Sequence, residues 1–121
     1  MSESLAAAEI RPVARMFKAL GDDTRLRIVA LLSHGELCVC HLESALGLAQ
    51  PTASRQLAVL KAAGIVESRR EGSWVYYRLA RQLDPGCRDQ LAALVKGFAN
   101  RDVLKRDVAR LLKTRGPGAC R

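Results

Sequence analysis

Two cysteines separated by a single residue, Cys38 and Cys40, are the side chains of this sequence best suited to chemistry. Thiolates are soft ligands that select thiophilic ions, and the start of a helix lowers a thiol pKa and favours the thiolate. In a regular helix, residues i and i+2 point about 200° apart, so both sulfurs can hold one ion only if the first turn is unwound or never fully formed. The pair predicts a thiophilic-ion site, with buried structural cysteines as the alternative.

A second candidate site is a polar segment placed where a helix is expected to begin. Arginine pairs bidentately with guanine, glutamine pairs with adenine, and hydroxyl groups reach either base edge, while a helix N-terminus offers N–H groups to phosphate. The segment predicts DNA readout by five side chains: Gln50, Thr52, Ser54, Arg55 and Gln56. Two further residues, Arg69 and Arg70, come just before a predicted hairpin tip and are expected to contact the DNA backbone or the minor groove.

The elements that position these residues follow from the hydrophobic periodicity. Helices are expected from about Pro12 to residue 20 and over residues 24–32, followed by two short helices over residues 40–46 and 51–63. The turn between the short helices contains glycine, which is typical of a helix-turn-helix. Two β-rich runs, residues 65–70 and 73–79, then predict a hairpin joined at Glu71–Gly72, and a hairpin behind a helix-turn-helix is a wing.

The predicted fold class is therefore mainly α with a β-hairpin wing: a winged helix-turn-helix that is dimeric through its terminal helices. Residues 1–11 are expected to be a flexible N-terminus, residues 12–113 a single domain, and residues 114–121 a disordered tail. The terminal helices, which Gly97 and Asn100 could break in two, carry a long apolar stripe suited to a subunit interface. Two-fold pairing would space the recognition helices by about 34 Å, one turn of B-DNA.

Composition agrees with a nucleic-acid partner. The 121 residues carry a formal net charge of +8, which favours a polyanionic partner, and residues 51–81 contain six basic and two acidic side chains. No apolar run approaches the about 18 residues of a membrane span, and no secretory signal is visible, so a cytoplasmic location is expected. In that reducing compartment the four cysteines favour thiol chemistry or metal ligation over disulfides.

Four stretches together resemble the arsenic-resistance operon repressors of the ArsR/SmtB family of winged-helix metal sensors. They are residues 36–42 (ELCVCHL), 50–57 (QPTASRQL), 63–66 (AGIV) and 72–79 (GSWVYYRL). The resemblance covers about residues 12–82. It implies a homodimer that represses its own operon and leaves operator DNA when it binds arsenite or antimonite, As(III) or Sb(III), with Cys38 and Cys40 as two of the sulfur ligands.

The sequence departs from that family pattern at one position. The best-known members have a third cysteine three residues after the second, where this chain has Glu43. The third sulfur is then expected from Cys87 or Cys120, of the same or the partner subunit, or from a small thiol. A zinc site on the terminal helices is disfavoured because residues 83–121 contain no histidine.

Two other functions compete with metalloid sensing. A thiol-oxidation sensor, or a sensor of another thiophilic metal, would use the same scaffold with Cys38 and Cys40 as the switch. A small cysteine enzyme is disfavoured, because the sequence offers no C-x-x-C motif and no βαβ unit and because the helix-turn-helix would be unexplained. The chain is therefore expected not to be an enzyme.

Overall fold

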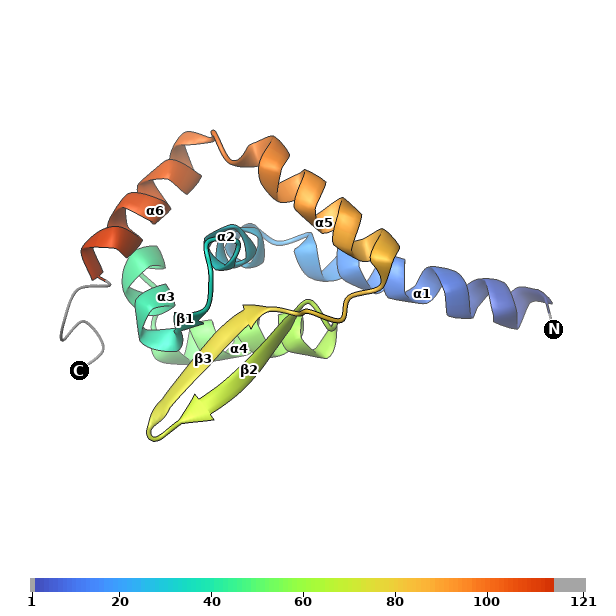
Figure 1. Cartoon of the computed structure of the whole chain (residues 1–121), viewed down its shortest axis with the longest axis horizontal. Coiled ribbons are helices and arrows are strands. Elements are labelled where there is room, and N and C mark those ends of the chain that lie inside the picture. The colour runs from blue at the N-terminus through green and yellow to red at the C-terminus, as the bar shows by residue number, and fades with distance from the viewer. Residues whose placement is uncertain (1, 115–121) are drawn as a thin grey trace.

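The computed structural model describes residues 2–114, in which six helices accompany one three-stranded sheet (Figure 1). In chain order the elements are α1 (Ser2–Leu20), α2 (Asp23–Leu32), β1 (Leu37–Cys38), α3 (Val39–Leu46), α4 (Gln50–Ala62), β2 (Val66–Glu71), β3 (Trp74–Leu79), α5 (Pro85–Phe98) and α6 (Asp102–Thr114). Helices α3 and α4 form the helix-turn-helix, and the β2–β3 hairpin behind them is the wing. The predicted winged helix-turn-helix fold is confirmed.

Local signals in the sequence set the ends of several helices. Asp22 caps α2, its side chain accepting a 3.0 Å hydrogen bond from the backbone N–H of Arg25. Gly47 ends α3 with φ +65°, a left-handed conformation that glycine adopts without strain. Pro51 lies in the first turn of α4, where its missing N–H has no intrahelical partner to lose. The turn between α3 and α4 is therefore fixed by glycine at one end and proline at the other.

The sheet joins the wing to the segment that precedes α3. All pairs are antiparallel in the order β1–β3–β2, and Glu71 pairs with Trp74 across a two-residue turn. That turn is formed by Gly72 and Ser73, one residue later than predicted, with Gly72 at φ +61° as two-residue hairpin turns require. Strand β1 was not predicted. It places Leu37 opposite Tyr77 and fixes the start of α3 to the wing.

The first helix begins earlier than the sequence indicates. Instead of starting near Pro12, α1 is helical from Ser2 and passes through this proline. Proline removes one helical hydrogen bond but, where the rest of the turn is intact, bends a helix rather than ending it. The flexibility expected of residues 1–11 stays a prediction. Of the tail expected over residues 114–121, Thr114 ends α6, and residues 115–121 with Cys120 lie outside the described residues.

The core surrounds α2, which Figure 1 shows end-on beneath an arch formed by α5 and α6. The predicted break of the terminal helix is confirmed, because α5 ends at Phe98 and α6 begins at Asp102. Helix α6 packs against α2 and α3 and buries Leu111. It also buries Asp107, whose two carboxylate oxygens accept hydrogen bonds of 2.7 and 2.8 Å from Arg27 on α2. No helix within residues 2–114 combines the length and apolar character needed to cross a bilayer.

Candidate thiol site and nucleic-acid interface

The two neighbouring cysteines lie at the junction between β1 and α3. Cys38 is the last residue of β1 and precedes α3 with an extended backbone (φ −71°, ψ 147°), whereas Cys40 lies in the first turn of the helix. Because only one of the two is helical, the opposed directions of a regular helix do not apply. The two Sγ atoms lie 3.3 Å apart. The expectation that the first turn is unwound or never fully formed stays a prediction for the ion-bound state, because α3 is helical from Val39 and Cys38 lies outside the helix.

The separation of the two sulfurs suits a single thiophilic ion. Two thiolates that each lie about 2.3 Å from a common ion are separated by roughly 3.8 Å in a tetrahedral zinc–thiolate site, so the observed 3.3 Å corresponds to a narrower angle at the ion. Cys38 is buried, with 2% of its surface exposed, and Cys40 is partly buried. The two sulfurs therefore lie close enough to be considered as ligands of one ion.

The described residues do not bring a third ligand to this pair. Within residues 2–114 no cluster of three or more cysteine, histidine or acidic side chains has the geometry to hold an ion. Cys87 lies in the first turn of α5, where burial, and then the charge of Asp84, raises the pKa of its thiol. The structure thus brings Cys38 and Cys40 close together, and Cys87 of the same subunit does not belong to this cluster.

Helix α4 presents most of its predicted DNA-reading residues outward. Its apolar stripe is fully buried and consists of Ala53, Leu57 and Leu60. On the other side, Gln50, Ser54 and Arg55 are exposed and Thr52 is partly buried. Gln50 donates a 2.8 Å hydrogen bond to Ser54, and Arg55 donates a long one of 3.4 Å to Thr52. These exposed bonds can be exchanged for bonds to DNA at little cost in free energy.

Gln56 differs from its neighbours on α4 because it faces the protein. It is partly buried, and its side-chain oxygen accepts a 2.8 Å hydrogen bond from Arg25 of α2. The same guanidinium donates to the backbone oxygen of Ala19 at the end of α1. Arg25 thereby links three helices, and Gln56 is the point at which α4 is attached to the other two.

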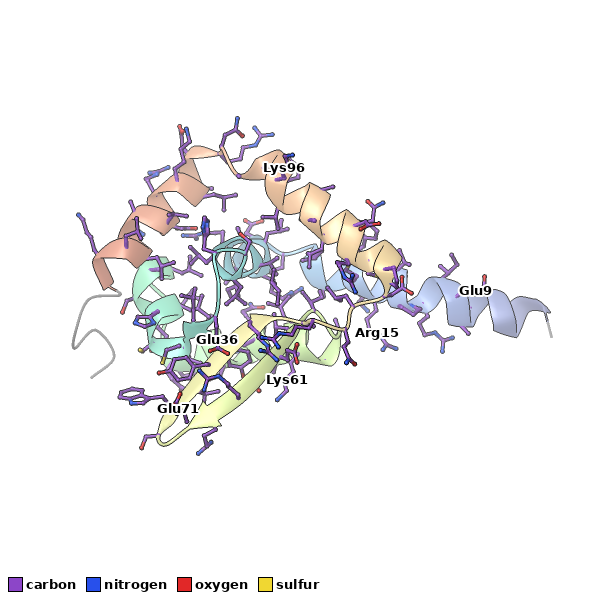
Figure 2. All side chains as sticks on the ribbon, viewed as in Figure 1. Glu9, Arg15, Glu36, Lys61, Glu71 and Lys96 are labelled. Atoms are coloured by element: carbon purple, nitrogen blue, oxygen red, sulfur yellow. The ribbon has the colours of Figure 1, made fainter. Side chains whose placement is uncertain are left out.

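The two wing arginines are in different surroundings. Arg70 pairs with Val75 through the backbone, but its exposed side chain has neither a hydrogen-bond nor an ion-pair partner within residues 2–114. Arg69 donates to both oxygens of Glu36, to Glu71 at 2.8 Å, and lies 4.6 Å from the centroid of the Tyr76 ring. Its hydrogen bonds raise the pKa of Arg69 and lower that of Glu36. Figure 2 shows Glu71 near the hairpin tip and Glu36 nearer its base.

The hydrogen bonds that Gln56 forms with Arg25, and Arg69 with Glu36, were not predicted from the sequence. Gln56 is 31 residues from Arg25, and Arg69 is 33 residues from Glu36. No local pattern relates residues so far apart, so only the packing of α4 on α2 and of β1 beside the wing reveals them. The single available signal was Glu36 itself, an acidic residue two positions before the cysteine pair.

Comparisons with known proteins agree with this architecture. The family model "Bacterial regulatory protein, arsR family" matches residues 22–68. The chain is 46% identical over 112 residues to the arsenic resistance transcriptional regulator ArsR1 of Pseudomonas putida, spanning 87% of this chain and 84% of that protein. It is 54% identical over 67 residues to the arsenical resistance operon repressor of Escherichia coli, spanning 54% of this chain and 57% of that protein.

A solved structure gives the same result for the fold. It is the homodimeric winged helix-turn-helix DNA-binding domain of a possible ArsR-family transcriptional regulator from Mycobacterium bovis. The two chains are 38% identical with a TM-score of 0.65, and the match covers 79% of this chain and 87% of that one. Taken with the extended similarity to the Pseudomonas regulator, these matches establish that the chain belongs to the arsR family of bacterial regulatory proteins.

Proposed function

We propose that this regulator is a homodimeric repressor that binds operator DNA and releases it when As(III) or Sb(III) binds the thiolates of Cys38 and Cys40. The observation that carries the proposal is the 3.3 Å separation of their sulfur atoms at the start of α3. The names of the arsenic-resistance relatives support a metalloid as the inducer. The softness of thiolate ligands likewise favours a thiophilic ion over nickel or cobalt at a site built from sulfur.

The DNA-binding surface consists of the start of α4 and the wing. Gln50, Thr52, Ser54 and Arg55 read base edges and hold phosphates, and Arg70 contacts the backbone beside them. Two residues expected at this surface, Gln56 and Arg69, are bonded within the protein. We assign them the task of positioning α4 and the wing.

Dimerisation is proposed to use the terminal helices. An apolar groove of about 400 Å³ opens between α2, α5 and α6, and its lining includes Leu26, Leu94, Phe98 and Leu104. Phe98 and Val103, which both line this groove, are 45% and 41% exposed. The solved relative from Mycobacterium bovis is a homodimer, which supports a second copy of this chain as the partner.

Release follows from the place of the cysteines in the fold. A metalloid held by both sulfurs fixes Cys38 relative to Cys40 and so constrains the first turn of α3. Helix α3 packs against α4 and is joined to it by the short turn at Gly47. A change at the start of α3 therefore acts on the DNA-reading helix, and a coupling free energy of about 1–3 kcal/mol corresponds to a 5–150-fold loss of DNA affinity.

The third sulfur ligand is proposed to come from Cys120, from Cys87 of either subunit, or from a small thiol.

The function is tested by fluorescence anisotropy with a labelled duplex from the chain's own promoter. We expect specific binding in buffer and at least fivefold weaker binding in sodium arsenite. Tight binding that only hydrogen peroxide releases would instead establish the thiol-oxidation sensor. Unchanged affinity in both reagents would overturn a thiol-based sensor altogether.

A further inference from the structure

We propose that the cysteine pair acts on DNA binding by a second route, through the wing, and that Glu36, Arg69 and Tyr76 are the positioning residues of this route. The inference rests on the proposed function and deepens it. The route through α3 and α4 moves the residues that read bases. The route through the sheet moves the hairpin that contacts the DNA backbone.

The sheet aligns the side chains of Cys38, Tyr76 and Arg69 in one row. Tyr76 on β3 is the direct partner of Cys38 on β1 and also of Arg69 on β2. Directly opposed residues in an antiparallel sheet project from the same face with their Cβ atoms about 5 Å apart. The Tyr76 ring therefore lies between a proposed metalloid ligand and a wing arginine, and the guanidinium of that arginine lies 4.6 Å from the ring centroid.

Glu36 provides a second link between the cysteine segment and Arg69. It lies two residues before Cys38, and its carboxylate accepts hydrogen bonds from Nε of Arg69 at 3.0 Å and from Nη2 at 2.7 Å. This two-nitrogen geometry is the strong form of an arginine–carboxylate pair. Because Nη1 of Arg69 is bonded to Glu71, the guanidinium is held by two carboxylates and one aromatic ring.

The connection is well suited to transmit a small displacement. Strand β1 contains only Leu37 and Cys38, so a shift of the cysteine cannot be absorbed within a long strand. It must alter the pairing with Tyr76 or the bond between Glu36 and Arg69. The next residue on β2, Arg70, is the exposed wing cation proposed to contact phosphate, and its position depends on how its neighbour is held. Metalloid binding would thereby displace the wing from the DNA backbone.

The test compares operator affinity with and without sodium arsenite in matched variants. Glu36→Gln retains the size of the side chain but removes its charge. We expect its arsenite-induced loss of affinity, taken as the ratio of its own affinities without and with arsenite, to fall at least fivefold below the wild-type ratio. Glu67→Gln is the control, because Glu67 lies on β2 with Arg69 but pairs with Arg78 and accepts a hydrogen bond from the backbone N–H of Arg81, not from Arg69.

Further variants and a spectroscopic signal separate coupling from folding. Arg69→Lys keeps the charge but cannot form the two-nitrogen bond, so it should lose coupling as Glu36→Gln does, while Tyr76→Phe keeps the ring and should behave as wild type. Trp74, the only tryptophan, lies on β3 and is 41% exposed, so its emission reports on the wing. Arsenite should change that emission in wild type and leave it unchanged in Glu36→Gln.

The outcomes are distinct. A wild-type ratio and a wild-type change in emission in Glu36→Gln and Arg69→Lys would overturn the wing route and leave the proposed function standing. Equal losses of coupling in Glu36→Gln and the Glu67→Gln control would also overturn it, because the effect would then be general to the hairpin. A wild-type protein that keeps its operator in arsenite would overturn the proposed function, and this inference with it.

Discussion

Arg25 of α2 donates a 2.8 Å hydrogen bond to the side-chain oxygen of Gln56 on α4, so the helix proposed to read DNA is attached to the helix behind it. The attachment divides the polar residues of α4 into two groups. Those that face solvent can contact bases. Gln56 instead bonds to Arg25, and we propose that this bond sets the orientation of the solvent-facing residues.

This division gives a prediction for Gln56. Gln56→Ala and Arg25→Ala should each weaken operator binding. A double-mutant cycle should show a coupling free energy of about 0.5–3 kcal/mol, because each substitution removes the same hydrogen bond between Arg25 and Gln56. Fluorescence anisotropy on the promoter duplex measures all four affinities. Strictly additive losses would mean that the bond between Arg25 and Gln56 contributes nothing to operator binding. In contrast, Arg55→Ala should lose about 1–3 kcal/mol of discrimination between operator and random DNA while the dimer stays intact.

Arg70 is expected to contact phosphate. Arg70→Ala should reduce the slope of log K against log salt by about 2 for a dimer, because each subunit loses one phosphate contact worth about 0.9. Lys96→Ala is the control: Lys96 is exposed on α5, which Figure 2 shows on the side of the molecule away from the wing. The slope is measured by titration at four salt concentrations. The same slope in Arg70→Ala and wild type would remove Arg70 from the interface.

The pair formed by Arg27 and Asp107 should dominate the attachment of α6. Arg27→Leu leaves the carboxylate of Asp107, 1% exposed, buried without its partner, and should lower the free energy of unfolding by about 3 kcal/mol. Arg106→Leu is the control, because Arg106 is an exposed residue next to Asp107 on α6. Its free energy of unfolding should stay within about 0.5 kcal/mol of wild type. Urea unfolding followed by circular dichroism measures both. Equal stabilities of the two variants would show that the ion pair contributes nothing net.

Burial of Cys87 gives a pH dependence. Its raised thiol pKa means that the unfolded chain loses this proton first as pH rises. The stability contribution of Cys87 is therefore complete below the unfolded thiol pKa of about 8.5 and is lost progressively above it. Urea unfolding of wild type and Cys87→Ala at pH 7 and pH 10 should show a larger loss in wild type. Parallel losses in the two proteins would contradict the burial effect.

Much of the architecture could be predicted from the sequence because it depends on local signals. The turn residues Gly47 and Pro51 fix the helix-turn-helix, and the change from helical to alternating periodicity marks the wing. The start of α3 near Cys40 could be predicted from the apolar periodicity that follows it, and Cys38 lies outside the helix as its N-cap. What could not be predicted is tertiary: β1 is too short to show alternation, and Asp107 meets Arg27 across 80 residues. Pro12 disfavours a helix by its intrinsic propensity, but α1 continues through it.

The central claim is that the thiolates of Cys38 and Cys40 receive the inducer. It is tested most directly by arsenite titration of promoter complexes formed by wild type, Cys38→Ser, Cys40→Ser, Cys87→Ser and Cys120→Ser, with release followed by fluorescence anisotropy. We expect Cys38→Ser and Cys40→Ser to stay bound at arsenite concentrations that release wild type. Of the other two, any variant that also fails to respond identifies the third ligand. Release of Cys38→Ser and Cys40→Ser at the wild-type arsenite concentration would contradict the account.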